Sequence, residues 1–218
     1  MKPVNSLFAA AAFSLAALGA PAAQAQSTEV LNEGFGNVSG LSGWVQVNNS
    51  VPPGSAWFQG NAGLFTAQAG AADSYAAANY LGAANGIGTV DNWLITPVLN
   101  LTGESVLSFY TRQTGDPGFS DRLEVLYSSG SGTDLSGFTS LGIIGAGDYP
   151  ADWSQYSATV DASGEGRFAF RYYGPADTLN YVGLDTVSVV TAVPEPTTWA
   201  MLAAGLGLFG LRRRKFHA

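Results

Sequence analysis

The chain has 218 residues, of which 28 are glycine, and only 11% are charged, against a usual share of about 25%. Its net charge of −7 argues against a nucleic-acid partner, because binding to phosphates depends on lysine and arginine. There is no cysteine, which excludes cysteine nucleophiles, disulfides and zinc–thiolate sites. The single histidine is the penultimate residue, His217, so a Ser-His-Asp triad is nearly excluded as well.

Residues 1–25 contain the three parts of a secretory signal peptide. Lys2 supplies the positive start, an apolar stretch runs from Leu7 to Leu18, and Ala23-Gln24-Ala25 is a small-x-small cleavage site. We therefore predict that the protein is exported and that cleavage follows Ala25.

The body of the chain, residues 26–192, alternates apolar and polar side chains with a period of two. In one such segment Leu107, Phe109 and Thr111 lie on one face, and turn signals rich in glycine, such as residues 163–166, separate the segments. Roughly ten strands follow from this pattern, at residues 29–35, 43–47, 56–59, 75–80, 92–96, 106–112, 121–127, 154–160, 167–173 and 181–190. With no convincing amphipathic helix, the pattern predicts an all-β jelly-roll β-sandwich.

The body is also strongly acidic. Between Gln26 and Val193 four arginines face 15 acidic residues, which leaves a net charge of −11. Such a charge suits cation binding or simple solubility.

Four motifs in this body carry a resemblance to a family. They are Asn32-Glu33-Gly34-Phe35, the DNWLITP block at residues 91–97, FAFRYY at 168–173 and VGLDTV at 182–187. In this order they resemble the choice-of-anchor J domain, a relative of the cleaved-adhesin and MAM-like jelly rolls, over about residues 29–190. The LDDV ending that is common in that family is LDTV here, so Thr186 stands where the family has a second acid.

The resemblance implies a structural calcium ion between the first and last strands, with Glu33 and Asp185 as the matching ligands. Calcium takes oxygen ligands, about six to eight of them, from carboxylates, carbonyls and water. The alternative is that the two carboxylates cap turns or pair with Arg122 or Arg171.

Candidate binding residues are aromatic. Trp57 and Tyr149 lie next to turn residues, and we predict them to be surface side chains that could stack on a glycan, whereas Trp44, Trp93 and Trp153 are expected in the core.

Two pairs of carboxylates are the candidates for a catalytic site. Asp121 with Glu124, or Glu33 with Asp185, could act as paired glycosidase carboxylates, but an acidic domain produces such pairs easily by chance.

The segment after the body, residues 193–218, combines three features in a fixed order. Pro194-Glu195-Pro196 comes first, an apolar stretch from Trp199 to Leu211 follows, and Arg212-Arg213-Arg214-Lys215 comes next. This order resembles the PEP-CTERM sorting signal, whose apolar part forms a single hydrophobic helix. The resemblance implies recognition and cutting by a membrane-embedded exosortase, transient residence in the inner membrane, and a Gram-negative bacterium that makes exopolysaccharide. A permanent single-pass anchor is the alternative.

Together these features predict an exported, exosortase-processed protein of the cell surface or exopolysaccharide matrix, with a non-catalytic β-sandwich of the adhesion type. The two alternatives are a carbohydrate-binding module, which exopolysaccharide as a partner would suit, and a secreted glycan-active enzyme.

Overall fold

The structure is a computed structural model that describes residues 26–145 and 148–193. The predicted signal peptide and the segment from Pro194 onward, with all the predicted sorting residues and the predicted hydrophobic helix, lie outside the described residues. Within the described ranges, no helix has the length and apolar character needed to cross a membrane.

The described residues form ten strands and five short 3-10 helices. They are β1 (Ser27–Glu33), η1 (Val38–Gly40), β2 (Val45–Asn48), β3 (Phe58–Gln59), β4 (Ala76–Asn79), η2 (Tyr80–Gly82), η3 (Ala84–Gly86), β5 (Thr89–Ile95), β6 (Leu99–Gln113), β7 (Arg122–Ser129), η4 (Leu135–Gly137), β8 (Thr139–Gly145), β9 (Ser154–Pro175), η5 (Ala176–Thr178) and β10 (Tyr181–Ala192).

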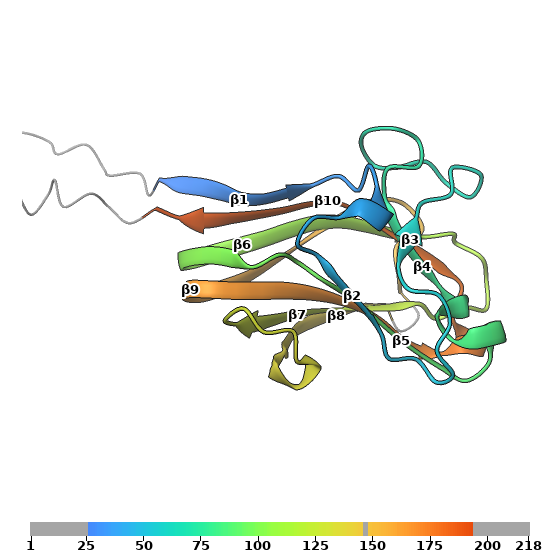
Figure 1. Cartoon of the computed structure of the whole chain (residues 1–218). Coiled ribbons are helices and arrows are strands. Elements are labelled where there is room, and N and C mark those ends of the chain that lie inside the picture. The colour runs from blue at the N-terminus through green and yellow to red at the C-terminus, as the bar shows by residue number, and fades with distance from the viewer. Residues whose placement is uncertain (1–25, 146–147, 194–218) are drawn as a thin grey trace, which may run out of the picture.

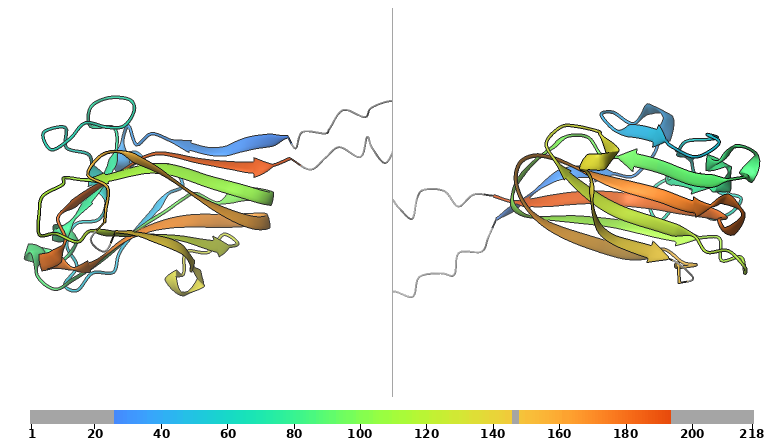
Figure 2. Two further views of the ribbon diagram at one scale, coloured as in Figure 1. Left: turned by 180° about the vertical axis from the view of Figure 1, so that it is seen from behind. Right: turned by 90° about the horizontal axis from the view of Figure 1, so that it is seen from below.

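All ten strands belong to one antiparallel sheet that curls into two layers (Figure 1). In the first layer β10 pairs with β6 along one edge and with β4 and β1 along the other, and β3 pairs with β4. In the second layer β5 and β7 flank β9, while β2 pairs with β5 and β8 pairs with β7. The two further views show the layers facing one another (Figure 2). The predicted all-β jelly-roll sandwich is confirmed.

A single strand of 22 residues, β9, joins the two layers. Its residues 154–166 pair with β6 in the first layer, and residues 166–175 pair with β7 and β5 in the second. The sequence predicts two strands here with a turn at 163–166, and this prediction is wrong because pairing continues through the glycines. Gly164 has a φ of 98°, a conformation that favours glycine, so the strand bends without ending.

The main core fills the space between the layers. It takes Leu107 and Phe109 from β6, Phe168 and Phe170 from β9, and Leu184 from β10, all of them buried. These residues alternate along their strands because successive side chains point to opposite faces of a sheet. The period-two pattern therefore identified the inward face of β6 and β9 correctly. Along β10 it fails after Asp185, because the pairing shifts between Asp185 and Ser188 and turns Val187 and Val189 into the core.

Two smaller clusters cover the outer faces of the layers. On the first layer Phe65, Tyr75, Tyr181 and the partly buried Trp153 pack together, and we call this group the aromatic cap. On the second layer Trp93, Ile95, Leu126 and Ala169 pack under residues of the segment that holds η4.

Both ends of the described chain leave the sandwich side by side. Ser27 pairs with Ala192, and the backbone N–H of Val193 donates to the carbonyl of Gln26 at 2.7 Å. The short strands β3 and β4, together with the loop before β7, lie at the opposite end, which we call the distal end (Figure 1).

Candidate functional site

Asp185 lies where β10 changes its partner along one edge from β4 to β1. Its carboxylate is buried and accepts three backbone N–H groups, from Gln68 (2.8 Å) and Ala69 (3.1 Å) on Oδ2 and from Thr186 (2.6 Å) on Oδ1. Burial raises the pKa of Asp185, and the hydrogen bonds offset that rise only in part. Asp185 therefore fastens the loop at residues 68–69 to the sheet, an arrangement that we call the Asp185 clasp.

The backbone beside the clasp is strained. Thr186 has a φ of 50°, which is rare for a β-branched residue, and its hydroxyl donates to Oε1 of Gln68 at 2.8 Å. Phe35, just after β1, also has a positive φ of 51°, and its N–H donates to Oε1 of Glu33 at 2.7 Å. Side-chain hydrogen bonds thus hold two unusual turns next to one another.

The two predicted calcium ligands do come near each other in the fold, because Glu33 pairs with Val187, two residues beyond Asp185. Calcium needs oxygen ligands, whereas N–H groups occupy the carboxylate of Asp185. The described part of the chain contains no group of three Asp, Glu or His side chains that could hold a metal ion. The donor set fits an anchored turn better than a calcium shell, so calcium binding by Glu33 and Asp185 stays a prediction.

Trp57 and Tyr149 are buried, so the prediction that both are surface side chains is wrong. Trp57 is 4% exposed and donates its indole N–H to the carbonyl of Asn92 at 3.3 Å. Tyr149 is 5% exposed, its hydroxyl is hydrogen-bonded to that of Thr111, and burial raises its pKa. Both belong to the main core, because the neighbouring turn residues bend the backbone while these side chains point inward. Trp44 and Trp93 are buried as expected, and Trp153 is partly buried.

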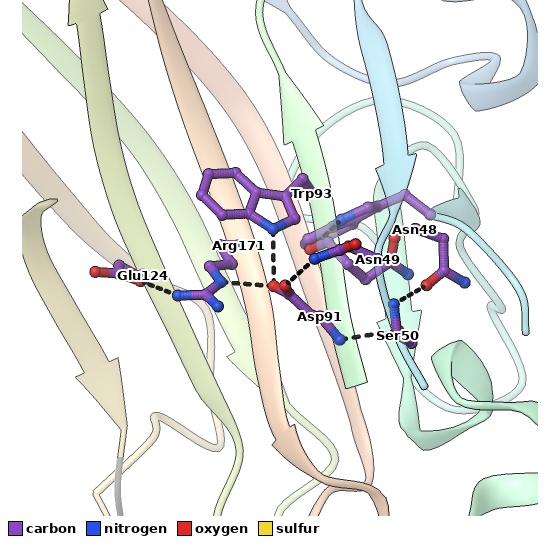
Figure 3. Close-up of polar contacts among 9 residues, drawn as sticks. Asn48, Asn49, Ser50, Asp91, Trp93, Glu124 and Arg171 are labelled. Carbon is purple, nitrogen blue, oxygen red and sulfur yellow. Dashed lines mark hydrogen bonds and ion pairs between the residues drawn. The ribbon is translucent and has the colours of Figure 1, made fainter. Parts of the chain in front are cut away.

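A row of polar side chains crosses the outer face of the second layer (Figure 3). Arg171 on β9 lies at its centre, where Nε donates to Oδ1 of Asp91 at 2.6 Å and Nη1 donates to Oε2 of Glu124 at 3.1 Å. Asp91 also accepts the indole N–H of Trp93 at 2.7 Å and the amide of Asn49 at 3.0 Å. We call these five residues the Arg171 row.

Strand register explains why the row forms. Arg171 lies directly opposite Trp93 on one side and Glu124 on the other, and Asp91 is the diagonal neighbour on β5. The guanidinium also packs 5.1 Å from the ring of Trp93 and 4.7 Å from that of Tyr173. Burial lowers the pKa of Arg171, but the hydrogen bonds and charges of Asp91 and Glu124 outweigh it and raise the pKa. The row is a preorganised polar surface whose groups largely satisfy one another.

The four carboxylates considered for glycosidase chemistry are each engaged by hydrogen bonds within the domain. Asp121 is buried on the inner side, where the hydroxyl of Tyr172 and the N–H of Asn180 donate to its Oδ1. Glu124 points to the outer face and is engaged by Arg171. The Glu33 and Asp185 carboxylates are held by backbone N–H groups.

Two family models match the sequence. The model for the Cleaved Adhesin Domain matches residues 28–189, from β1 to β10. The model for the PEP-CTERM protein-sorting motif matches residues 192–215, which includes every predicted sorting residue from Pro194 to Arg214. Both resemblances that the sequence suggested, to cleaved-adhesin domains and to PEP-CTERM signals, are thereby confirmed.

Solved structures of similar fold include two cleaved adhesin domains of Lys-gingipain from Porphyromonas gingivalis W83. The K1 domain is 28% identical with a TM-score of 0.58, over 75% of this chain and 97% of that one. The K3 domain is 25% identical with a TM-score of 0.56, over 76% of this chain and 99% of that one. A search of curated proteins finds no match.

Proposed function

The chain belongs to the cleaved adhesin domain family and carries a PEP-CTERM sorting motif, and from this premise we propose that it is an exported adhesion protein. Exosortase processes it toward the cell surface or the exopolysaccharide matrix, and its β-sandwich acts by binding, without catalysis. A residence in the inner membrane, through the segment after Val193, precedes this processing.

The observation that carries the proposal is the position of the two ends of the domain. The sorting motif begins at the end of β10, and the start of β1 pairs with that same end. A domain held there projects its distal end away from the point of attachment (Figure 1). Such an end-on arrangement suits an adhesin, because the loops of the distal end meet the partner first.

The test is to express the full chain in its exosortase-positive host and to measure the intact mass of the mature protein. We expect it to begin at Gln26 and to lack the residues after the Pro194-Glu195-Pro196 triplet. Replacing all three residues by alanine is expected to leave the tail in place and the protein in the membrane fraction.

A variant with alanine at Thr197 and Thr198 is the matched control, because it changes the neighbouring residues and keeps the triplet. It should be processed like the wild type. An uncut wild-type protein in that host, or equal processing of the triplet variant, would overturn the proposed role of exosortase.

A further inference from the structure

A hollow of about 290 Å³ opens at the distal end of the sandwich. The residues around it that the argument uses are Asn61, Leu64, Asn79, Tyr80, Asp116 and Asn180. It lies where β10 begins. Because β10 has 12 residues and rises about 3.3 Å per residue, the hollow is roughly 36 Å from the other end of that strand. We call it the distal pocket.

Two asparagine side chains at the pocket are oriented before any ligand arrives. Oδ1 of Asn61 accepts the N–H of Gly63 at 2.9 Å, and Oδ1 of Asn79 accepts the N–H of Leu81 at 3.0 Å. Because each carbonyl accepts an N–H of its own turn, the orientation of the amide is set and its Nδ2 group can donate to a ligand. The pocket therefore has two amide donors in fixed orientations.

In Asn180 the described part of the protein engages the amide nitrogen of the side chain and not its oxygen. Its Nδ2 donates to Oγ1 of Thr114 at 2.8 Å and to Oδ2 of Asp116 at 2.7 Å, so that its Oδ1 can act as an acceptor. Donors and acceptors together match hydroxyl groups, which both donate and accept hydrogen bonds. Fixing them in advance lowers the entropic cost of binding.

The pocket also has an exposed apolar surface. Tyr80 is 39% exposed and Leu64 is 51% exposed. Gly86 supports the Tyr80 ring, since an added Cβ at Gly86 would lie 2.8 Å from Cδ2 of Tyr80. A held aromatic ring beside fixed polar groups suits the apolar C–H face of a sugar ring.

The charge at this site bears on the kind of sugar that would fit it. Among the residues that the structure describes, Asp116 is the single charged one that lines the pocket, and the surrounding domain carries a net charge of −11. An anionic sugar such as a uronic acid would be repelled. The volume is near the lower limit of about 300 Å³ for small-molecule sites, which suits one sugar unit rather than several.

We propose that the distal pocket binds one unit of a neutral hexose glycan. This deepens the proposed function and rests on it, because it supposes that the adhesin meets a polysaccharide. Tyr80 packs against the sugar ring, Asn61 and Asn79 donate to its hydroxyls, and Asn180 accepts from them.

The experiment uses residues 26–193, which contain all ten strands and both partners of every strand pair. Side-chain amide signals are followed by NMR while methyl glycosides of glucose, galactose and mannose are added separately, with galacturonic acid as the anionic probe. At least one neutral glycoside is expected to shift the signals of Asn61, Asn79 and Asn180, and galacturonic acid is not. Tyr80→Ala is expected to weaken this binding about tenfold or more.

Two control variants locate the site. Phe119→Ala removes an aromatic ring of matching exposure, 38%, that does not line the pocket, and it should bind like the wild type. Tyr173→Ala changes the ring beside the Arg171 row, and it too should bind normally. If Tyr173→Ala abolishes binding while Tyr80→Ala does not, the sugar binds at the Arg171 row and the distal pocket is refuted.

A second measurement separates this proposal from the proposed function. Exopolysaccharide from the producing bacterium is tested for binding to the wild type and to Tyr80→Ala, and weaker binding by the variant supports the pocket. Equal binding by both would overturn the pocket and leave the adhesin function standing. A failure of all three neutral glycosides to shift the amide signals overturns the pocket, whatever the polysaccharide does.

Discussion

At the scale of single residues, Asp185 joins a loop to the sheet through three backbone N–H groups. Asp185→Asn keeps the shape but replaces one oxygen by an NH2 group, which cannot accept the N–H groups that the replaced oxygen accepts. We expect the free energy of unfolding to fall by roughly 1–3 kcal/mol. Urea unfolding of residues 26–193, with Asp152→Asn as an exposed control, measures the difference.

The same variant tests the calcium prediction. An ion held by Glu33 and Asp185 would raise the melting temperature of the wild type in calcium relative to EDTA, because a ligand that binds the folded state alone stabilises it. The Asp185→Asn variant should then lack that difference. Equal melting of the wild type in calcium and in EDTA would contradict the calcium site and leave the clasp as the role of Asp185.

Asp121 gives the domain a pH dependence. Burial raises its pKa, although the hydrogen bonds from Tyr172 and Asn180 oppose the rise. A carboxyl group whose pKa is higher in the folded state than in the unfolded state binds its proton more tightly when the protein is folded. It therefore stabilises the fold below its unfolded pKa of about 3.9, and this stabilisation is lost as the pH rises through the folded pKa. Asp185 acts in the same direction. We expect Asp121→Asn to lessen the fall in unfolding free energy from about pH 4 upward.

Asp134→Asn is the control for this measurement. Hydrogen bonds from the backbone and hydroxyl of Ser136 lower the pKa of Asp134, so its contribution is present above the unfolded pKa and lost as the pH falls through the folded one. Its replacement should therefore not lessen the fall. Parallel pH profiles for the wild type and Asp121→Asn would show that Asp121 titrates normally.

At the scale of elements, Gly183 on β10 lets the aromatic cap contact the strand directly. An added Cβ would lie 2.8 Å from Trp153, 2.9 Å from Phe65 and 3.0 Å from Tyr75. Gly183→Ala must displace these rings, and we expect it to lower the free energy of unfolding by about 1–3 kcal/mol. The control is Gly142→Ala on β8, where no atom of residues 26–145 or 148–193 lies within 4 Å of the added Cβ. That variant should be neutral or slightly stabilising in urea unfolding, and equal losses in both would contradict the packing argument.

The elements also show what sequence patterns can and cannot reveal. Leu107 and Phe109 predict β6 because a half-buried strand must alternate. β8 pairs with β7 alone and exposes Ile143 by 54%, so it lacks that alternation and was not predicted. The glycines at 163–166 resemble a turn in sequence, yet β6 supplies hydrogen-bonding partners on that stretch and keeps it extended.

In the candidate site, too, the sequence predicted some residues and missed others. Glu33 and Asp185 came from motif resemblance, and the fold does bring them near each other. The Arg171 row was missed because its members come from four separate segments of the chain, and only the pairing order β5–β9–β7 brings Asp91, Arg171 and Glu124 together. The one local signal was the i, i+2 spacing of Asp91 with Trp93 and of Arg171 with Tyr173, which places each pair on one face.

At the scale of the whole molecule, the adjacent ends allow the chain to be rejoined. Gln26 and Val193 are hydrogen-bonded, so a short glycine-serine linker can connect them without strain. A circular permutant opened between Gly132 and Thr133 breaks an exposed loop and keeps every strand whole. We expect it to unfold in one cooperative transition, with a free energy close to that of the wild type.

A second permutant, opened between Ser163 and Gly164, tests whether β9 is one continuous strand or two strands joined by a turn. If these residues formed the turn that their sequence suggests, this opening would be as harmless as the first. In the fold, Ser163 pairs with Thr102 and Gly164 with Leu101, so the cut severs the strand that carries the chain from one layer to the other. The layers would then lose their continuous strand, and we expect either no cooperative unfolding in urea or a free energy several kcal/mol lower, of order 3 kcal/mol or more. Equal stability of the two permutants would mean that β9 is two strands and that the main core alone holds the layers together.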